Sequence, residues 1–353
     1  MDSTADPDAS STDYYYPDSN SSPCSGEVIQ NGSKWLLATF YCLLFVFGLL
    51  GNSLVILVLV ACKKLRSITD VYLLNLALSD LLLVFSFPFQ THYLLDEWVF
   101  GLVLCKVVSG SYYLGFFSSM FFITLMSVDR YLAIVRTVYA LRVRTAQKGI
   151  VLSLIVWLTA LVATSPLLVF YQVDVEDGVR QCYSFYDQQT VKWKLFIHFE
   201  MNILGLLVPF SILIFCYVNI LHQLKHCQNH NKAKAINLVL IVVVTSFVFW
   251  VPFNVVLFLM SLHDLHVLDG CAVSQRLIYA THVTEIISFT HCCMNPVIYA
   301  FLGEKFKKHL SEIFQKSFSL VSPYLGMPVP RESGEKSSSH QVSSRSSSAD
   351  YIL

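Results

Sequence analysis

The chain has 353 residues, of which 55% are hydrophobic and only 14% are charged. Soluble domains carry about 25% charged residues, so a large part of this apolar surface must face something other than water. The 24 basic residues balance the 24 acidic ones, so the net charge gives no case for a nucleic-acid partner. The composition therefore favours an integral membrane protein over a soluble domain.

Seven long apolar stretches follow one another along the chain. They cover about 35–61, 68–95, 103–135, 149–172, 197–224, 235–262 and 277–302. Each exceeds the roughly 20 residues that a helix needs to cross a bilayer, and none shows the strict alternation of a membrane β-strand of about 9–11 residues. The sequence predicts an all-α membrane protein, a bundle of seven transmembrane helices.

The charges between these spans predict the orientation. The connectors 62–67, 136–148 and 225–234 contain ten basic residues and no acidic one, so the positive-inside rule places them in the cytosol. The opposite side, made by 1–34, 96–106, 174–194 and 264–276, holds 14 acidic and 6 basic residues. We therefore expect a plasma-membrane protein with an extracellular N-terminus and an acidic outer face.

Four regions are predicted along the chain. Residues 1–34 form an acidic extracellular arm, 35–302 the transmembrane domain, 303–316 an amphipathic helix lying on the membrane lipid, and 317–353 a disordered cytoplasmic tail. The tail is rich in serine, and phosphorylation would give it a dense negative charge that suits a basic partner of the arrestin kind. The serines concerned are Ser337, Ser338, Ser339, Ser343, Ser344, Ser346, Ser347 and Ser348.

Four of the ten cysteines fall on the predicted outer side, where disulfides form. They are Cys24, Cys105, Cys182 and Cys271, and they allow three pairings. A Cys105–Cys182 bond would hold the long connector 174–194 across the mouth of the bundle and leave Cys24 to join Cys271, although spacing alone also allows one pair to remain free. Asn20 and Asn31 begin glycosylation sequons on the same side.

A set of short motifs in the spans resembles the chemokine-receptor branch of the class A G-protein-coupled receptors. The string DRYLAIV, from Asp129 to Val135, ends the third span, and NPVIY, from Asn295 to Tyr299, lies in the seventh. FVFWVPFN in the sixth span, the four outer cysteines, WVFG before Cys105 and HCCM before Asn295 agree with this family. The resemblance covers about residues 24–315.

The resemblance implies a set of signalling residues that rearrange when a ligand binds. Arg130 lies 25 residues after Cys105, about 37 Å along a helix, so it reaches the cytoplasmic end of the bundle. We expect Asp129 to hold Arg130 in the idle receptor and to release it to an intracellular partner. The full implied set is Asp129, Arg130, Tyr131, Tyr217, Trp250, Pro252, Asn295, Pro296 and Tyr299.

Asp80 lies in the middle of the second span, where an ionised carboxylate is costly unless it is paired or solvated. Asn52, Ser119 and Asn295 fall at a similar depth. In the resembled class such groups hold a sodium ion, which is the only cofactor that the resemblance implies. A cluster of hydrogen bonds with water and no ion is the competing interpretation.

The outer half of the bundle predicts a ligand pocket. Glu285 lies ten residues before Asn295, about 15 Å toward the outside, and Tyr41, Tyr112 and Tyr113 reach a similar level. A carboxylate among tyrosines suits a cationic ligand group, although Glu285 bonded to Tyr41 without any ligand is the alternative. Gln90 stands where the family often has tryptophan, so it is added to the predicted ligand-binding residues.

The N-terminal arm carries three adjacent tyrosines, Tyr14, Tyr15 and Tyr16, among acidic residues. The resemblance implies that they are sulfated and bind a basic CC chemokine, and that the receptor activates a G protein of the inhibitory class. A decoy receptor without G-protein coupling and a transporter or channel are the alternatives. The intact DRYLAIV string and the absence of an inverted repeat weigh against them, and no catalytic constellation indicates an enzyme.

Overall fold

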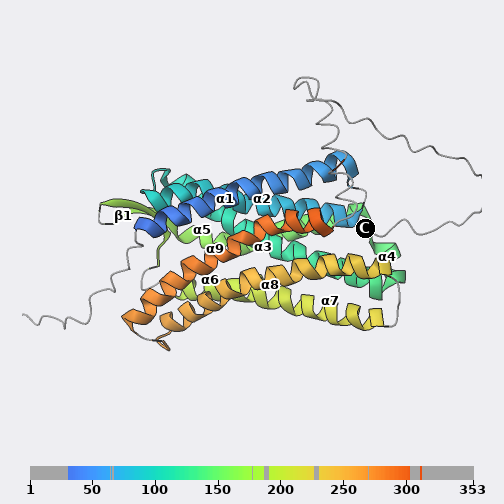
Figure 1. The fold of residues 1–353 in the computed structure, drawn as a ribbon. Helices are drawn as coiled ribbons and strands as arrows, with labels where there is room; N and C mark the ends of the chain where they lie inside the picture. Colours follow the sequence, from blue (N-terminus) through green and yellow to red (C-terminus); the bar gives the residue numbers. More distant parts are fainter. Residues whose placement is uncertain are drawn as a thin grey trace, which may run out of the picture.

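The computed structural model describes residues 31–63, 65, 67–176, 178–186, 191–225, 230–268, 270–302 and 311. Seven helical rods lie side by side in one bundle, as Figure 1 shows. The rods are α1 (Asn31–Leu57) continued by the π-helical η1 (Val58–Lys63), α2 (Ile68–Leu95), α3 (Gly101–Val135), α5 (Ala146–Phe170), α6 (Val191–Asn202) continued by the π-helical η2 (Ile203–Leu207) and α7 (Val208–Lys225), α8 (His230–Asp264) and α9 (Cys271–Leu302).

Six of these rods are long and apolar enough to cross a membrane among the residues described. They correspond to the first six predicted spans, and each agrees with its predicted bounds within about six residues. The seventh rod, α9, has 32 residues but carries Arg276, His282, Glu285 and His291. It packs against α1, α2 and α8. His291 is buried and Glu285 is half-buried in the bundle, whereas Arg276 and His282 are exposed.

Apolar side chains lie on the outside of the bundle as well as in its core. On α5, Ile150, Leu154, Leu158 and Leu161 recur at helical spacing, and each is more than half exposed. In water such a stripe would be unfavourable, whereas the acyl chains of a bilayer cover it at no cost. Its exposure fits a rod that faces lipid.

Helix α3 lies at the centre of the bundle and contacts α2, α5, α7 and α8. Its buried side chains Phe116, Phe117, Met120 and Ile123 belong to the largest core cluster. Trp157 of α5 donates its indole N–H to Oδ1 of Asn75 on α2 at 2.8 Å, behind α3. Because α3 runs through the centre of the bundle, the side chains along its whole length contact several other helices.

Two connectors contain regular structure that the sequence did not predict. The connector 136–148 contains the short helix α4 (Thr137–Val143), and the connector after α5 forms an antiparallel hairpin of β1 (Tyr171–Glu176) and β2 (Val179–Ser184). Gly178, with φ of +80°, supplies the left-handed turn between the strands. Figure 1 shows β1 and α4 at opposite ends of the bundle.

A disulfide joins Cys182 of β2 to Cys105 of α3, with a Cα–Cα distance of 5.8 Å. The backbone N–H of Trp98 donates to the carbonyl of Arg180 at 2.9 Å, which adds a second link between the hairpin and the bundle. Cys271 is disulfide-bonded as well, and its predicted partner Cys24 lies outside the described residues. The predicted bond from Cys105 to Cys182 is therefore present, and the hairpin lies against the outer end of α3.

Several predictions fall outside the described residues. These are the extracellular arm with Tyr14, Tyr15, Tyr16 and Asn20, the amphipathic helix at 303–316 and the serine-rich tail. The side chains of Asn31 and Tyr299, whose backbones belong to α1 and α9, are outside them too. All of these remain predictions.

Candidate functional site

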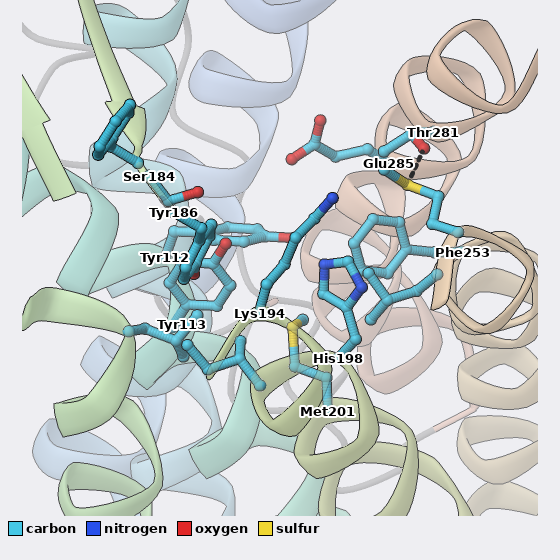
Figure 2. A pocket seen from close by; sticks show the side chains of 15 residues that line it. Tyr112, Tyr113, Ser184, Tyr186, Lys194, His198, Met201, Phe253, Thr281 and Glu285 are labelled. Atoms are coloured by element: carbon cyan, nitrogen blue, oxygen red, sulfur yellow. Dashed lines mark hydrogen bonds between the residues drawn. The ribbon is translucent and has the colours of Figure 1, made fainter. Parts of the chain in front are cut away.

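A cavity of about 450 Å³ opens between α3, α6, α8 and α9 at the end of the bundle that carries the hairpin. Figure 2 shows the side chains that line it. Tyr112 and Tyr113 of α3 form one wall, and Glu285 of α9 faces them across the space. Three of the four residues predicted to form the carboxylate-and-tyrosine ligand site, Glu285, Tyr112 and Tyr113, therefore line one cavity.

Glu285 is the acidic residue of this cavity, and it comes from α9 one turn after Thr281. Among the described residues its carboxylate receives no hydrogen bond and forms no ion pair, whereas the Thr281 hydroxyl donates to the Leu277 carbonyl at 2.9 Å. The hydroxyl of Tyr112 is buried and has no hydrogen-bond partner. An acceptor and a buried hydroxyl are thus left for a ligand to satisfy.

Tyr41 and Gln90 do not line this cavity, so a role for them in ligand binding stays a prediction. Tyr41 is buried at the α1–α2–α9 contact, where its ring centroid lies 6.0 Å from that of Phe87 and 5.8 Å from that of Phe289. The alternative in which Glu285 bonds to Tyr41 is also absent from the described contacts. Helical rise placed Tyr41 at the correct depth, but it could not show which way its ring points.

The cavity contains charged groups that sequence analysis missed. Lys194 of α6 lines it, and the Lys194 Nζ lies 2.8 Å from Oδ1 of Asp264 on α8. One turn further along α6, the His198 Nδ1 lies 3.3 Å from the hydroxyl of Ser261 on α8. These two contacts join α6 to α8 beside the cavity. Lys194 and His198 are four residues apart, and this spacing could have shown from the sequence that they lie on the same face of a helix.

Tyr186, in the segment between β2 and α6, completes the outer wall of the cavity. Burial raises the pKa of Tyr186 to about 12, a larger effect than the hydrogen bond from Ser184 that lowers it. Tyr186 is therefore a neutral phenol at physiological pH. It adds a hydrogen-bonding group to this wall without adding charge.

Deeper in the bundle, Asp80 is almost fully buried and is held by two hydrogen bonds. Asn295 Nδ2 donates to Asp80 Oδ2 at 2.8 Å, and the Ser119 hydroxyl donates to Asp80 Oδ1 at 3.4 Å. Oδ1 of Asn295 is buried without a partner. A carboxylate, an amide carbonyl and a hydroxyl are oxygen donors of the kind that a hard cation such as sodium takes.

The amide Nδ2 of Asn52 donates to the carbonyls of Gly48 at 3.0 Å and Cys292 at 2.9 Å. No bond between Asn52 and Asp80 occurs among the described residues. The neighbouring His291 lies 2.9 Å from the Ser246 hydroxyl through Nε2. A sodium ion would be held by Asp80, Ser119 and Asn295. The bond from Asn52 to the Cys292 carbonyl links α1 to α9 beside them, and the predicted contact of Asn52 with the ion stays a prediction.

Trp250 connects the cavity to this polar layer. Its ring centroid lies 4.5 Å from that of Phe116 on α3 and 6.1 Å from that of His291 on α9. The indole nitrogen of Trp250 is buried without a partner. Two residues later, Pro252 interrupts the hydrogen bonds inside α8, and Pro296 does the same in α9, which leaves each helix with a weak point near the polar layer.

At the other end of the bundle, Asp129 and Arg130 lie in the last two turns of α3 and are buried. Asp129 does not hold Arg130, contrary to our expectation, because both of its oxygens accept hydrogen bonds from Arg144 at 2.7 and 3.0 Å. Arg130 Nη2 instead donates to the Thr69 hydroxyl at 3.0 Å. Arg144 follows α4, an element that the sequence analysis did not predict.

Two aromatic residues of the predicted switch, Tyr131 and Tyr217, lie at this end of the bundle. Tyr131 packs on Phe215 of α7 with a centroid distance of 5.6 Å. Tyr217, also on α7, is buried, and its hydroxyl lies toward Ser127 of α3 without forming a hydrogen bond of good geometry. These side chains form the contact between α3 and α7 at this end, and the hydroxyl of Tyr217 is left for another group to bind.

The family model of the seven-transmembrane receptors of the rhodopsin family matches residues 51–299. The C-C chemokine receptor type 8 of Homo sapiens is 77% identical over 343 residues, which are 97% of this chain and 97% of that protein. The type 8 receptor of Macaca mulatta is 75% identical over the full length of both chains, and the type 4 receptor of Homo sapiens is 46% identical over 90% of this chain and 88% of its own. The chain belongs to the C-C chemokine receptors.

Membership of this family confirms the fold and class predicted from the sequence. The receptor is a bundle of seven transmembrane helices, a multi-pass protein of the plasma membrane, and not an enzyme. The matched segment, 51–299, begins next to Asn52 and ends at Tyr299, so it contains the cavity, the polar layer around Asp80 and the Arg130 end. The roles of the individual residues are not tested by this likeness.

Proposed function

We propose that the receptor binds a basic CC chemokine outside the cell and passes the signal to a G protein of the inhibitory class inside it. The likeness to C-C chemokine receptors supports the ligand class and the G protein as partner. The orientation that this requires, with the N-terminus outside, is supported by the hairpin and its disulfide at the cavity end, because disulfides form on the oxidising side.

The observation that carries this proposal is the unpaired Glu285 carboxylate in a cavity walled by tyrosines. A carboxylate inside a membrane bundle is costly unless a cation or water compensates it. An ammonium or guanidinium from the ligand would supply that cation, and the rings of Tyr112 and Tyr113 would add cation–π attraction. Glu285, Tyr112 and Tyr113 are therefore the central ligand-binding residues.

The acidic extracellular arm supplies the second contact with the ligand. Sulfated Tyr14, Tyr15 and Tyr16 would add fixed negative charge and attract the basic body of a chemokine before its end enters the cavity. Such attraction chiefly accelerates association and weakens as salt screens it. Glycosylation of Asn20 and Asn31 belongs to the same extracellular region.

Activation would separate the cytoplasmic ends of the helices and expose Arg130 to the G protein. The path from the cavity runs through Trp250, which contacts Phe116 directly beneath the tyrosines, and through the weak points at Pro252 and Pro296. A sodium ion at Asp80 would favour the inactive bundle. Phosphorylated serines of the tail would then recruit arrestin, and the predicted helix at 303–316 would rest on membrane lipid.

The test is nucleotide exchange on an inhibitory-class G protein in membranes that contain the native receptor, titrated with a panel of CC chemokines. We expect one or more of them to stimulate exchange, Arg130→Ala to abolish the stimulation with ligand binding retained, and Glu285→Gln to weaken ligand potency about tenfold or more, as for a desolvated ion pair. Glu200→Gln is the matched control, since Glu200 is a carboxylate of α6 outside the cavity lining.

No stimulation of the native receptor by any CC chemokine would refute the proposed function. Binding without exchange would indicate the decoy receptor instead. Equal potency of the Glu285→Gln and Glu200→Gln variants would remove the cavity carboxylate from the ligand site. Antibody staining of a tag at residue 1 on intact cells tests the orientation separately.

A further inference from the structure

The cytoplasmic end of α3 contains a chain of polar contacts in which Arg130 and Asp129 do not meet directly. Arg144 binds Asp129 through two hydrogen bonds, Nε to Oδ1 at 2.7 Å and Nη2 to Oδ2 at 3.0 Å. Thr69 of α2 stands between the two neighbours, since its hydroxyl donates to Asp129 Oδ2 at 3.3 Å and accepts from Arg130 Nη2 at 3.0 Å. Asp129 is therefore already satisfied without Arg130.

The backbone holds Arg144 in place for this contact. Arg144 ends α4, where its N–H donates to the Ala140 carbonyl at 2.9 Å. The next residue, Thr145, begins α5, where its hydroxyl accepts from the Lys148 N–H at 3.3 Å. Arg144 thus lies between two helix ends, and its side chain is 21% exposed while that of Asp129 is 4% exposed.

Removal of Arg144 would leave Asp129 buried with only the Thr69 hydroxyl to compensate its charge. Loss of one partner from a buried ion pair is strongly unfavourable, so the carboxylate would take the nearest remaining cation. Arg130 is that cation, because it adjoins Asp129 in sequence and its buried Nε has no partner. The other nearby carboxylate, Asp70, is already bonded to the Ser67 N–H and hydroxyl at the start of α2.

We infer that Arg144 is a positioning residue for signalling: it occupies Asp129 and so keeps the guanidinium of Arg130 available to the intracellular partner. The planar guanidinium of Arg144 suits this task, since it matches both carboxylate oxygens at once, which a lysine does not. The inference rests on the proposed coupling to a G protein. It places part of the control of Arg130 in the second cytoplasmic connector.

The experiment measures chemokine-driven nucleotide exchange for the native receptor, Arg144→Ala, Asp129→Asn and the double variant, each normalised to ligand binding at the cell surface. We expect Arg144→Ala to reduce exchange about tenfold, as Asp129 captures Arg130. The double variant should return to within about twofold of Asp129→Asn, because a neutral amide does not capture a guanidinium. Arg142→Ala, an exposed arginine of α4 outside this contact chain, is the matched control and should behave as native.

The inference would be overturned if the native receptor stimulates nucleotide exchange and the Arg144→Ala variant stimulates it equally well. It would also be overturned if the double variant is impaired as severely as Arg144→Ala. If Arg144→Ala fails to reach the cell surface, the comparison of the double variant with Asp129→Asn still decides, since the inference requires these two to agree. Absence of exchange from the native receptor would refute the proposed function and is thereby distinguished from these outcomes.

Discussion

Gly205 permits the contact between α3 and Trp250, and an added methyl group at this position should destabilise the receptor. A Cβ on Gly205 would overlap Cζ of Phe116 and lie 2.6 Å from its Cε1. The Phe116 ring has little room to move, because it is fully buried with Trp250 at 4.5 Å and Phe117 at 5.0 Å between centroids. The clash must therefore be relieved by movement of η2 or of the Trp250 contact.

The magnitude follows from two opposing terms. Replacement of a helical glycine by alanine gains about 0.5–1 kcal/mol in backbone entropy. Overpacking of a close-packed core costs about 1–3 kcal/mol. The free energy of unfolding of the Gly205→Ala receptor should therefore fall by up to about 2.5 kcal/mol, with about 1 kcal/mol at the centre of this range, and its thermal unfolding midpoint in detergent should fall.

Gly110 on α3 provides a matched control with the opposite expected sign. A Cβ there would lie 3.1 Å from Cδ2 of Leu168, the end of a flexible and partly exposed side chain. Because Leu168 can rotate away, Gly110→Ala should keep the gain in entropy and leave the midpoint unchanged or higher. Equal midpoints for Gly205→Ala and Gly110→Ala would refute the reasoning, and so would failure of Phe116→Leu to rescue Gly205→Ala.

Three further predictions concern the other contacts of the receptor. Asp264→Ala should lower the thermal unfolding midpoint, because it leaves the Lys194 ammonium without its partner. The double variant Asp264→Ala with Lys194→Met should recover part of this loss, and additive effects of the two substitutions would contradict the prediction. Sodium chloride should stabilise the native receptor more than choline chloride does, and Asp80→Asn should respond equally to both salts; an unchanged difference argues against the ion. Cys105→Ser should lose about 2–5 kcal/mol, and adding Cys182→Ser should cost little more, as measured by thermal unfolding; additive losses would mean separate roles.

The sequence determined the number of membrane-spanning helices, their order and their approximate ends. These follow from the bilayer itself, which requires about 20 apolar residues for each span and penalises charge within it. The same penalty singled out Asp80 and Glu285, and the rise along each helix placed Glu285, Tyr112 and Tyr113 at a similar depth. The external cysteines left three pairings open, and the tertiary structure selected Cys105 with Cys182.

Only the tertiary structure decided which side chains meet across helices. Rise along a helix fixes depth, whereas rotation about the helix axis is set by packing; Tyr41 therefore lies at the predicted level but faces Phe87 and Phe289 instead of the cavity. Lys194 finds Asp264, and Arg144 takes the carboxylate of Asp129, through contacts between segments far apart in the chain. Such pairings depend on how the rods rotate and where the connectors fold, which local periodicity does not encode.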